Sequence, residues 1–149
     1  MLSPMSDLTK LLDPTVRPTV VNDVTGLVDR TIASQSGLTG MAIKSATSAA
    51  RKADADIVSK VINRSLPDIV DALTPYWDAY DAEQSAGFGN YLASRQDDVV
   101  ADVLGLGDKY VQQAPAAAQK VYSSLRGKAG KIIAPALPEF GEIIERHAL

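Results

Sequence analysis

Apolar positions recur every three or four residues along most of the chain. Between residues 18 and 33 they fall on one helical face, which carries Val20, Val21, Val24, Leu27, Val28 and Ile32. The same period returns over 57–80 and after residue 94, and no segment shows the strict alternation of a half-buried strand. The pattern therefore predicts an all-α fold, a compact bundle of about six or seven short helices.

One ten-residue segment occurs twice in this pattern. Residues 20–29 read VVNDVTGLVD and residues 99–108 read VVADVLGLGD, so seven of the ten positions are identical. A second pair follows in the same order, with KVI then LPDIVD inside residues 60–71 and KII then LPEFGE inside residues 131–142. Collinear self-similarity of this kind indicates an internal repeat of one helical unit.

The repeat divides the chain into two pseudo-repeated three-helix halves. We expect a single helical domain over residues 1–149, with an N-terminal arm at 1–13, half one at 14–83, a junction at 84–93 and half two at 94–149. A length of 149 residues with 46% apolar residues suits one core of this kind.

Prolines and glycines add local detail. Pro67 and Pro75 each remove an amide donor from the helical stretch 57–80, so we expect three short rods there. Gly26 and Gly105 fall inside predicted helices, where glycine costs about 1 kcal/mol relative to alanine. We therefore expect another helix to cross the chain at each of these glycines.

Two more helices follow from composition and capping. Residues 38–52 are rich in glycine, alanine and serine, which allow backbones to approach closely, so this helix is expected to be central and surrounded by neighbours. Ser94 precedes Asp97 and Asp98 and is expected to cap the helix that carries the second copy of the repeated segment.

Charge and residue usage narrow the possible functions. The net charge of −3 argues against a nucleic-acid partner, because neutralising phosphates requires a basic surface. The chain has no cysteine, which excludes disulfides and thiolate chemistry and suits a reducing compartment. No run of about 18 apolar residues predicts a transmembrane segment, and the first residues do not form a signal peptide. We expect a soluble, cytoplasmic protein.

Five of the chain's eight aromatic residues gather at the junction between the halves. They are Tyr76, Trp77, Tyr80, Phe88 and Tyr91. An aromatic stripe at helical spacing is typical of a core, whereas a solvent-facing cluster of the same residues would form a ligand pocket or a partner-docking patch. The sequence leaves both interpretations open.

A second helix rich in alanine and serine is expected from Pro115 through Leu125. Cations collect near the ends of this helix and of the helix over 38–52, and form candidate anion contacts. They are Arg51, Lys52, Arg126, Lys128 and Lys131. Cations at helix C-termini complement the dipole and the free carbonyls, and the same residues could hold an anionic ligand or a lipid headgroup. The run from Arg126 to Lys131 lacks the spacing of a phosphate loop and follows no strand, so nucleotide chemistry is not predicted.

Carboxylates and the single histidine complete the candidate chemistry. Asp98 and Asp102 share a helical face, and Asp78, Asp81 and Glu83 precede them. A carboxylate-bridged metal pair in a helical bundle normally adds Glu-x-x-His pairs, which this chain does not contain. His147 has no partner at metal-ligand spacing and is expected to be a helix-terminal cation. We expect no catalytic residue, no metal and no cofactor.

Five motifs, taken together, resemble a known family. They are LLDP at 11–14, the segment 20–29, LPD at 66–68 with Tyr76 and Trp77, SLRG at 124–127, and LP at 137–138 with RHA at 146–148. In this combination the whole chain resembles a family of small, uncharacterised, actinobacterial all-helical proteins. The resemblance implies a bacterial cytoplasmic origin, and it brings no established activity and no site residue.

These observations favour a non-catalytic helical interaction or adaptor protein that binds a protein partner or forms a homodimer. The alternative is a carrier of an apolar or amphipathic, lipid-like ligand, in which small-residue helices and the aromatic junction line a cavity. A carboxylate-metal enzyme is the third hypothesis.

Overall fold

The computed structural model describes residues 8–80, 87–113 and 116–148, and all of its regular elements are helical. In chain order they are η2 (Leu8–Leu12), α1 (Arg17–Ala33), α2 (Gly37–Ala53), α3 (Ile57–Ala79), α4 (Phe88–Ser94), α5 (Gln96–Val111), α6 (Ala116–Arg126), α7 (Ala129–Ile133), η3 (Ala134–Ala136) and α8 (Leu137–Ala148). The predicted all-α class is confirmed. Residues 1–7 of the expected arm and 84–86 of the expected junction lie outside the described residues.

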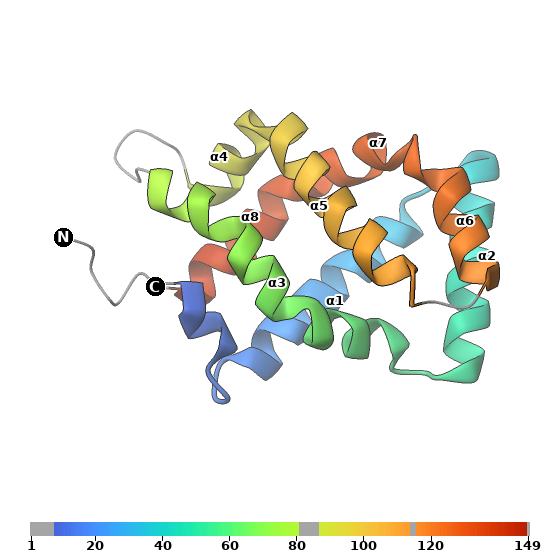
Figure 1. The fold of residues 1–149 in the computed structure, drawn as a ribbon, viewed down its shortest axis with the longest axis horizontal. Coiled ribbons are helices and arrows are strands. Elements are labelled where there is room, and N and C mark those ends of the chain that lie inside the picture. The colour runs from blue at the N-terminus through green and yellow to red at the C-terminus, as the bar shows by residue number, and fades with distance from the viewer. Residues whose placement is uncertain (1–7, 81–86, 114–115, 149) are drawn as a thin grey trace.

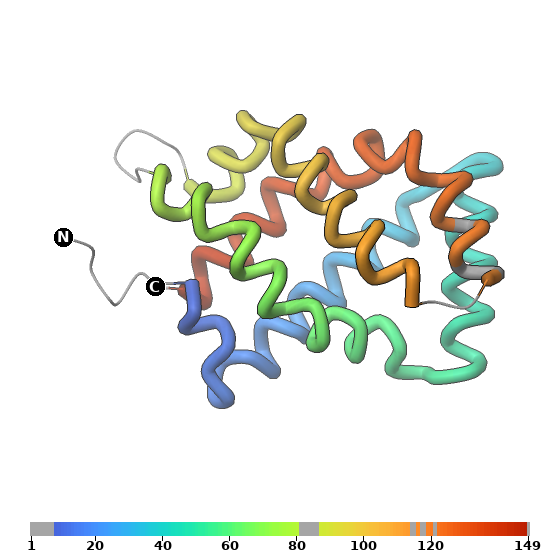
Figure 2. Tube along the Cα trace, in the orientation of Figure 1, coloured from blue at the N-terminus to red at the C-terminus, as the bar shows by residue number. Residues whose placement is uncertain are grey.

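The core lies at one end of the molecule, where α8 packs against α4, α1 and η2 (Figure 1). Its completely buried side chains come from η2, α1, α3, α4, α5 and α8, and include Leu8, Leu11, Val20, Leu66, Phe88, Leu92, Val99 and Ile144. The first described segment and the last helix lie side by side there, as the blue and red ends of the tube in Figure 2 show. Elements from both ends of the chain therefore close the same core.

Helices α4 and α8 approach one another closely at two glycines. A Cβ atom placed on Gly141 would lie 2.3 Å from the Cα atom of Gly89, and one placed on Gly89 would lie 2.0 Å from the carbonyl oxygen of Pro138. Only glycine fits at either position, because these neighbours are backbone atoms that cannot turn aside. The expected crossings at Gly26 and Gly105 are absent from the described structure: a Cβ at Gly105 meets nothing within 4 Å, and one at Gly26 meets only the flexible end of Arg30.

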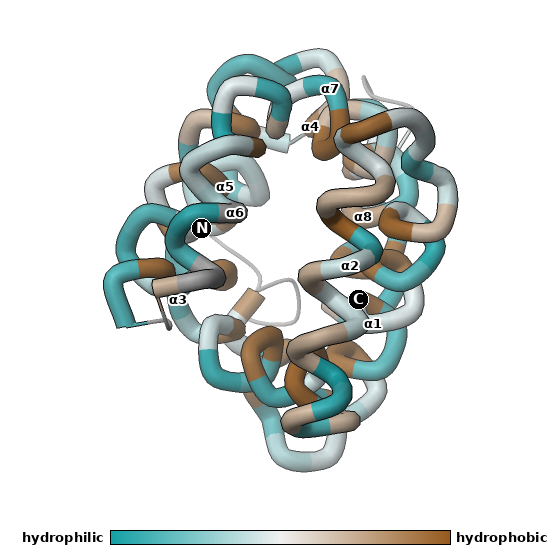
Figure 3. Tube along the Cα trace, turned by 90° about the vertical axis from the view of Figure 1, so that its right-hand side faces the viewer, coloured by the Kyte–Doolittle hydropathy of each residue, from teal (hydrophilic) through white to brown (hydrophobic). Residues whose placement is uncertain are grey.

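The small-residue helix α2 lies at the opposite end of the molecule, packed against α6 (Figure 1). Gly40 is the only buried residue of α2, and no described residue of α6 is buried. The prediction that α2 is central and surrounded is wrong, because α2 packs mainly against α1 and α6 and most of its residues are exposed. Figure 3 looks onto this end and shows hydrophobic and hydrophilic residues interspersed along each helix, as expected for amphipathic helices.

Helix α3 is continuous through both of its prolines, so the prediction of three short rods is wrong. Pro67 cannot donate to the carbonyl of Asn63, four residues earlier. Arg17 of α1 supplies that missing donor, because its Nη2 donates to the Asn63 carbonyl oxygen and its Nε donates to Asn63 Oδ1 at 2.7 Å. A side chain from a neighbouring helix thus compensates for the proline.

The structure does not confirm the two pseudo-repeated halves. Val20 and Val99 are both buried, as are Leu66 and Leu137. Their helices nevertheless have different neighbours: α1 packs mainly on α3 and α8, whereas α5 packs mainly on α7 and α6. Ser94 is the last residue of α4, and Arg95 precedes α5 without a side-chain capping bond, so the expected Ser94 cap is also wrong.

Candidate functional site

Four of the five clustered aromatic residues pack together in the core. The rings of Trp77 and Phe88 meet edge to face with centroids 4.9 Å apart, and Tyr80 and Tyr91 contact the same group. Trp77, Phe88 and Tyr91 are 9% exposed or less. Tyr76 points its hydroxyl at α5 instead, where it donates to Asp102 Oδ2 at 2.6 Å. The structure brings four of the five residues together where α3 meets α4 and directs Tyr76 elsewhere.

Glu145 of α8 links the aromatic cluster to the last helix by accepting two hydrogen bonds. Its Oε2 accepts a hydrogen bond from the Tyr80 hydroxyl at 2.8 Å, and its Oε1 accepts one from the Phe88 backbone N–H at 3.2 Å. That N–H lies in the first turn of α4, where helical amides have no partner within the helix. Gly87, with φ of 104°, turns the chain into α4 just before it. No sequence pattern pointed to Glu145, because its partners are 57 and 65 residues away.

Both candidate arginines are engaged by aspartates at the end of the repeated segment. Asp29 closes the first copy and pairs with Arg51 of α2, and Asp108 closes the second copy and pairs with Arg126 of α6. The second pair is bidentate, with Arg126 Nε and Nη2 donating to the two Asp108 oxygens at 2.9 and 2.8 Å. These bonds, with a further one from the Tyr122 hydroxyl, lower the pKa of Asp108 to about 2. Each arginine ties a small-residue helix to the helix before it.

The candidate lysines lie on two different parts of the surface. Lys52 shares with Lys44 and Arg51 a groove of about 550 Å³ between α1 and α2. Lys128, between α6 and α7, donates to Thr39 Oγ1 at 3.1 Å, and Lys131 is exposed on α7. The structure therefore brings Arg51 and Lys52 together and places Arg126, Lys128 and Lys131 in a second group beside α2.

The most exposed large apolar side chains of the described structure lie on α2. Leu38 is 85% exposed and Met41 is 67% exposed. The two residues are three positions apart, which places them on the same helical face. Sequence reasoning missed them because α2 was expected to be central. The signal that could have found them is charge, since residues 37–53 and 116–133 contain no aspartate or glutamate.

The carboxylates and the histidine form contacts between helices. His147 Nε2 lies 2.6 Å from Asp23 Oδ2, and Arg146 Nη1 lies 3.6 Å from the same oxygen, so α8 is joined to α1. His147 is thus more than the helix-end cation that the sequence predicted. No group of three histidines or carboxylates suited to a metal occurs within the described residues, while Asp81 and Glu83 of the candidate set lie outside them. None of the helices of the described part is long and apolar enough to cross a bilayer.

The chain belongs to DUF6918, a family of unknown function, whose model matches residues 8–148. This confirms the predicted resemblance to a family without an established activity, and the actinobacterial origin stays a prediction. No match was found among curated proteins or among solved structures.

Proposed function

We propose that this member of the DUF6918 family is a non-catalytic interaction protein that docks its partner through an end face. We define the end face as the outward surface of α2, α6 and α7, residues 37–53 and 116–133. The observation that carries the proposal is the exposure of Leu38 and Met41, at 85% and 67%, on one face of α2.

Because Leu38 and Met41 stay in water, the protein does not gain the free energy that burying apolar side chains provides in its core. Burying a leucine or methionine side chain stabilises a protein by about 1.5–3 kcal/mol. In α2 the inward side carries Gly40, Ile43 and Thr47, whereas Leu38 and Met41 point outward. A partner that covers Leu38 and Met41 would recover that stabilisation as binding energy.

The end face is also fixed in place, as a docking surface needs to be. The Arg51–Asp29 pair holds α2 to α1, and the bidentate Arg126–Asp108 pair holds α6 to α5. Lys128 bonds to Thr39 and so links the α6–α7 connection to α2. Preorganised surfaces lose less conformational entropy on binding, which favours affinity.

A second candidate function, the carrier of an amphipathic ligand, is favoured by one observation. The groove of about 550 Å³ between α1 and α2 combines apolar Ile32 and Ala33 with the cations of Lys44, Arg51 and Lys52. Its size falls within the range of small-molecule sites. Native mass spectrometry of protein purified from its own host separates the two functions, because a carrier would retain a lipid-sized adduct and an interaction protein would not.

Site-specific photo-crosslinking tests the interaction function. A photoreactive amino acid replaces Met41 on the end face, and in a matched control it replaces Glu142, which is exposed on α8. We expect adducts with a partner from position 41 and none from position 142, and a homodimer would give a crosslink between two copies. Equal labelling from both positions, or none from either, would contradict docking through the end face.

A further inference from the structure

We infer that the partner of the end face is the surface of an anionic lipid bilayer, on which the molecule lies without crossing it. This inference rests on the proposed docking function and names the chemistry of its partner.

Positive charge is concentrated in two segments of the chain, which the net charge alone does not show. The whole chain carries −3. Residues 37–53 carry +3 and residues 116–133 carry +4, so the remaining residues together carry −10. Because α2 and α6 pack against one another, the two basic segments form one continuous surface. An anionic surface would attract this end and repel the rest, which orients the molecule before contact.

The arginines of the end face form ion pairs within the protein, so the cations available to a partner are its lysines. The ion pairs recorded among the described residues engage Arg51 and Arg126, but none of the lysines of the end face. Those lysines are Lys44, Lys52, Lys120, Lys128 and Lys131. Asp29 and Asp108 are engaged by these arginines, and Asp54, which follows α2, is engaged by Lys60 at 2.7 Å. The end face therefore keeps a positive field of point charges, the form in which basic segments attract anionic headgroups.

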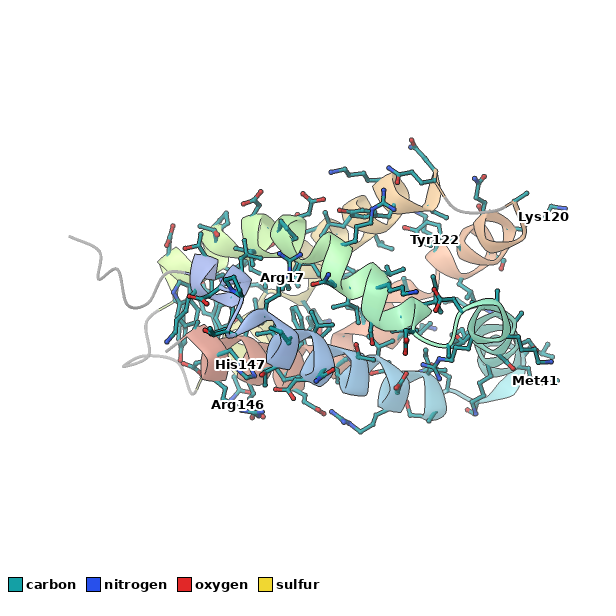
Figure 4. The ribbon with its side chains drawn as sticks, turned by 90° about the horizontal axis from the view of Figure 1, so that it is seen from below. Arg17, Met41, Lys120, Tyr122, Arg146 and His147 are labelled. Carbon is teal, nitrogen blue, oxygen red and sulfur yellow. The ribbon has the colours of Figure 1, made fainter. Side chains whose placement is uncertain are left out.

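Apolar side chains project from the same end of the molecule as these lysines. Figure 4 shows Met41 of α2 and Lys120 of α6 pointing away from the body at the same end of the molecule. Helices that lie in a bilayer surface combine an apolar side, inserted by about 5–10 Å, with lysine or arginine beside it. Leu38 and Met41 provide the inserted side, and the lysines of α2 and α6 provide the flanking charge.

Two other anionic partners fit the surface less well. Single-stranded nucleic acid is bound by exposed aromatic rings on which bases stack. Tyr122, the one aromatic residue of the end face, instead turns inward to bond Asp108 and the Leu104 carbonyl. A protein partner would need its own pocket to receive Leu38 and Met41, whereas a bilayer accepts protruding apolar groups without a matching shape.

Vesicle co-sedimentation tests the inference directly. The full chain is mixed with vesicles of equal parts phosphatidylcholine and phosphatidylglycerol, and in parallel with vesicles of phosphatidylcholine alone. We expect binding to the anionic vesicles only, and the binding should weaken as salt is raised.

Two variants locate the contact, and one serves as a control. L38S with M41S removes the inserted groups, and Lys44→Gln with Lys52→Gln and Lys120→Gln removes three charges. We expect the lysine variant to bind anionic vesicles roughly a hundredfold more weakly. The serine variant should weaken binding at least about tenfold, and circular dichroism should show both folded, because all five residues are exposed. The control removes three cations outside the end face, Lys10, Lys60 and Arg64, and should bind as the parent does.

The vesicle and crosslinking results together distinguish failure of the bilayer inference from failure of the proposed docking function. If the parent stays in solution with both kinds of vesicle while Met41 still crosslinks to a protein or a nucleic acid, the bilayer inference is wrong and the docking function stands. If the serine and lysine variants sediment like the parent, binding occurs elsewhere and the inference is likewise wrong. If neither vesicles nor a crosslinked partner are found, both proposals fail.

Discussion

Arg17 donates to the carbonyl oxygen of Asn63, the carbonyl that Pro67 leaves without its helical donor. The Asn63 carbonyl is exposed, so water could also bond to it, and the bond from Arg17 contributes a net stabilisation of about 0.5–1.5 kcal/mol. The α1 side chain therefore supports α3 at a residue type that usually kinks or ends a helix.

This relationship predicts energetic coupling between Arg17 and Pro67. Arg17→Met keeps most of the side-chain stem and removes the donors, so it should destabilise the parent. In a Pro67→Ala background the new amide can bond Asn63, so the same change should cost about 1 kcal/mol less. Urea denaturation of the four proteins measures the coupling, and strictly additive effects would show that the proline and the arginine act independently.

The crossing of α4 and α8 predicts opposite effects at two glycines. Gly141→Ala forces a methyl group to within 2.3 Å of the Gly89 Cα atom, so we expect a loss of about 1–3 kcal/mol or more. Gly105→Ala, inside α5 with nothing within 4 Å, should instead gain about 0.5–1 kcal/mol. Thermal melting compares the two variants. A stabilised Gly141→Ala protein would mean that the helices are farther apart in solution.

Burial of the aromatic cluster predicts a large effect for its tryptophan. Trp77 is 9% exposed, so Trp77→Ala should cost about 3–5 kcal/mol, whereas Val61→Ala at a position 49% exposed should cost much less. Trp77 emission in the parent should be blue-shifted and resist quenching by iodide. Red-shifted, readily quenched emission would show instead that the cluster opens to solvent and could receive a ligand.

The lowered pKa of Asp108 predicts that the folded protein loses stability in acid. Arg126, and then Tyr122, lower the pKa of this carboxyl from 3.8 to about 2, so the folded state favours its charged form. The resulting stabilisation is complete above about pH 4 and is lost as the pH falls toward 2. Asp108→Asn should therefore be less stable than the parent at pH 6, and the difference should shrink below pH 4. Denaturation at several pH values measures this, and Arg126→Gln should reduce the same pH dependence.

The helices could be predicted from the sequence because their apolar period is local. The face that begins at Val20 is buried through Leu27, as its spacing predicted. The continuity of α3 could not be predicted, because the donor that compensates for Pro67 lies 46 residues from Asn63. The same limit applies to Gly89 and Gly141, whose contact depends on how two distant helices cross.

The candidate site divides in a similar way. The gathering of Trp77 with Phe88 was visible as an aromatic cluster, but its place in the core was left open. The ion pairs of Arg51 with Asp29 and of Arg126 with Asp108 were not predicted. The two aspartates nevertheless occupy the same position in the two copies of the repeated segment. Exposure of α2 was missed because small residues indicate close packing without indicating on how many sides it occurs.

The position of α8 has a consequence for biosynthesis. This helix contributes Leu137, Ile143, Ile144 and Ala148 to the core, and it is the last of the described helices to leave the ribosome. Until then α4 lacks the helix against which it mainly packs, and η2 has α3 and α1 but not α8, so the emerging chain displays apolar faces until α8 has been synthesised. A nascent chain stalled before residue 137 should therefore be protease-sensitive and should engage chaperones, whereas release of α8 should close the fold in a single late step.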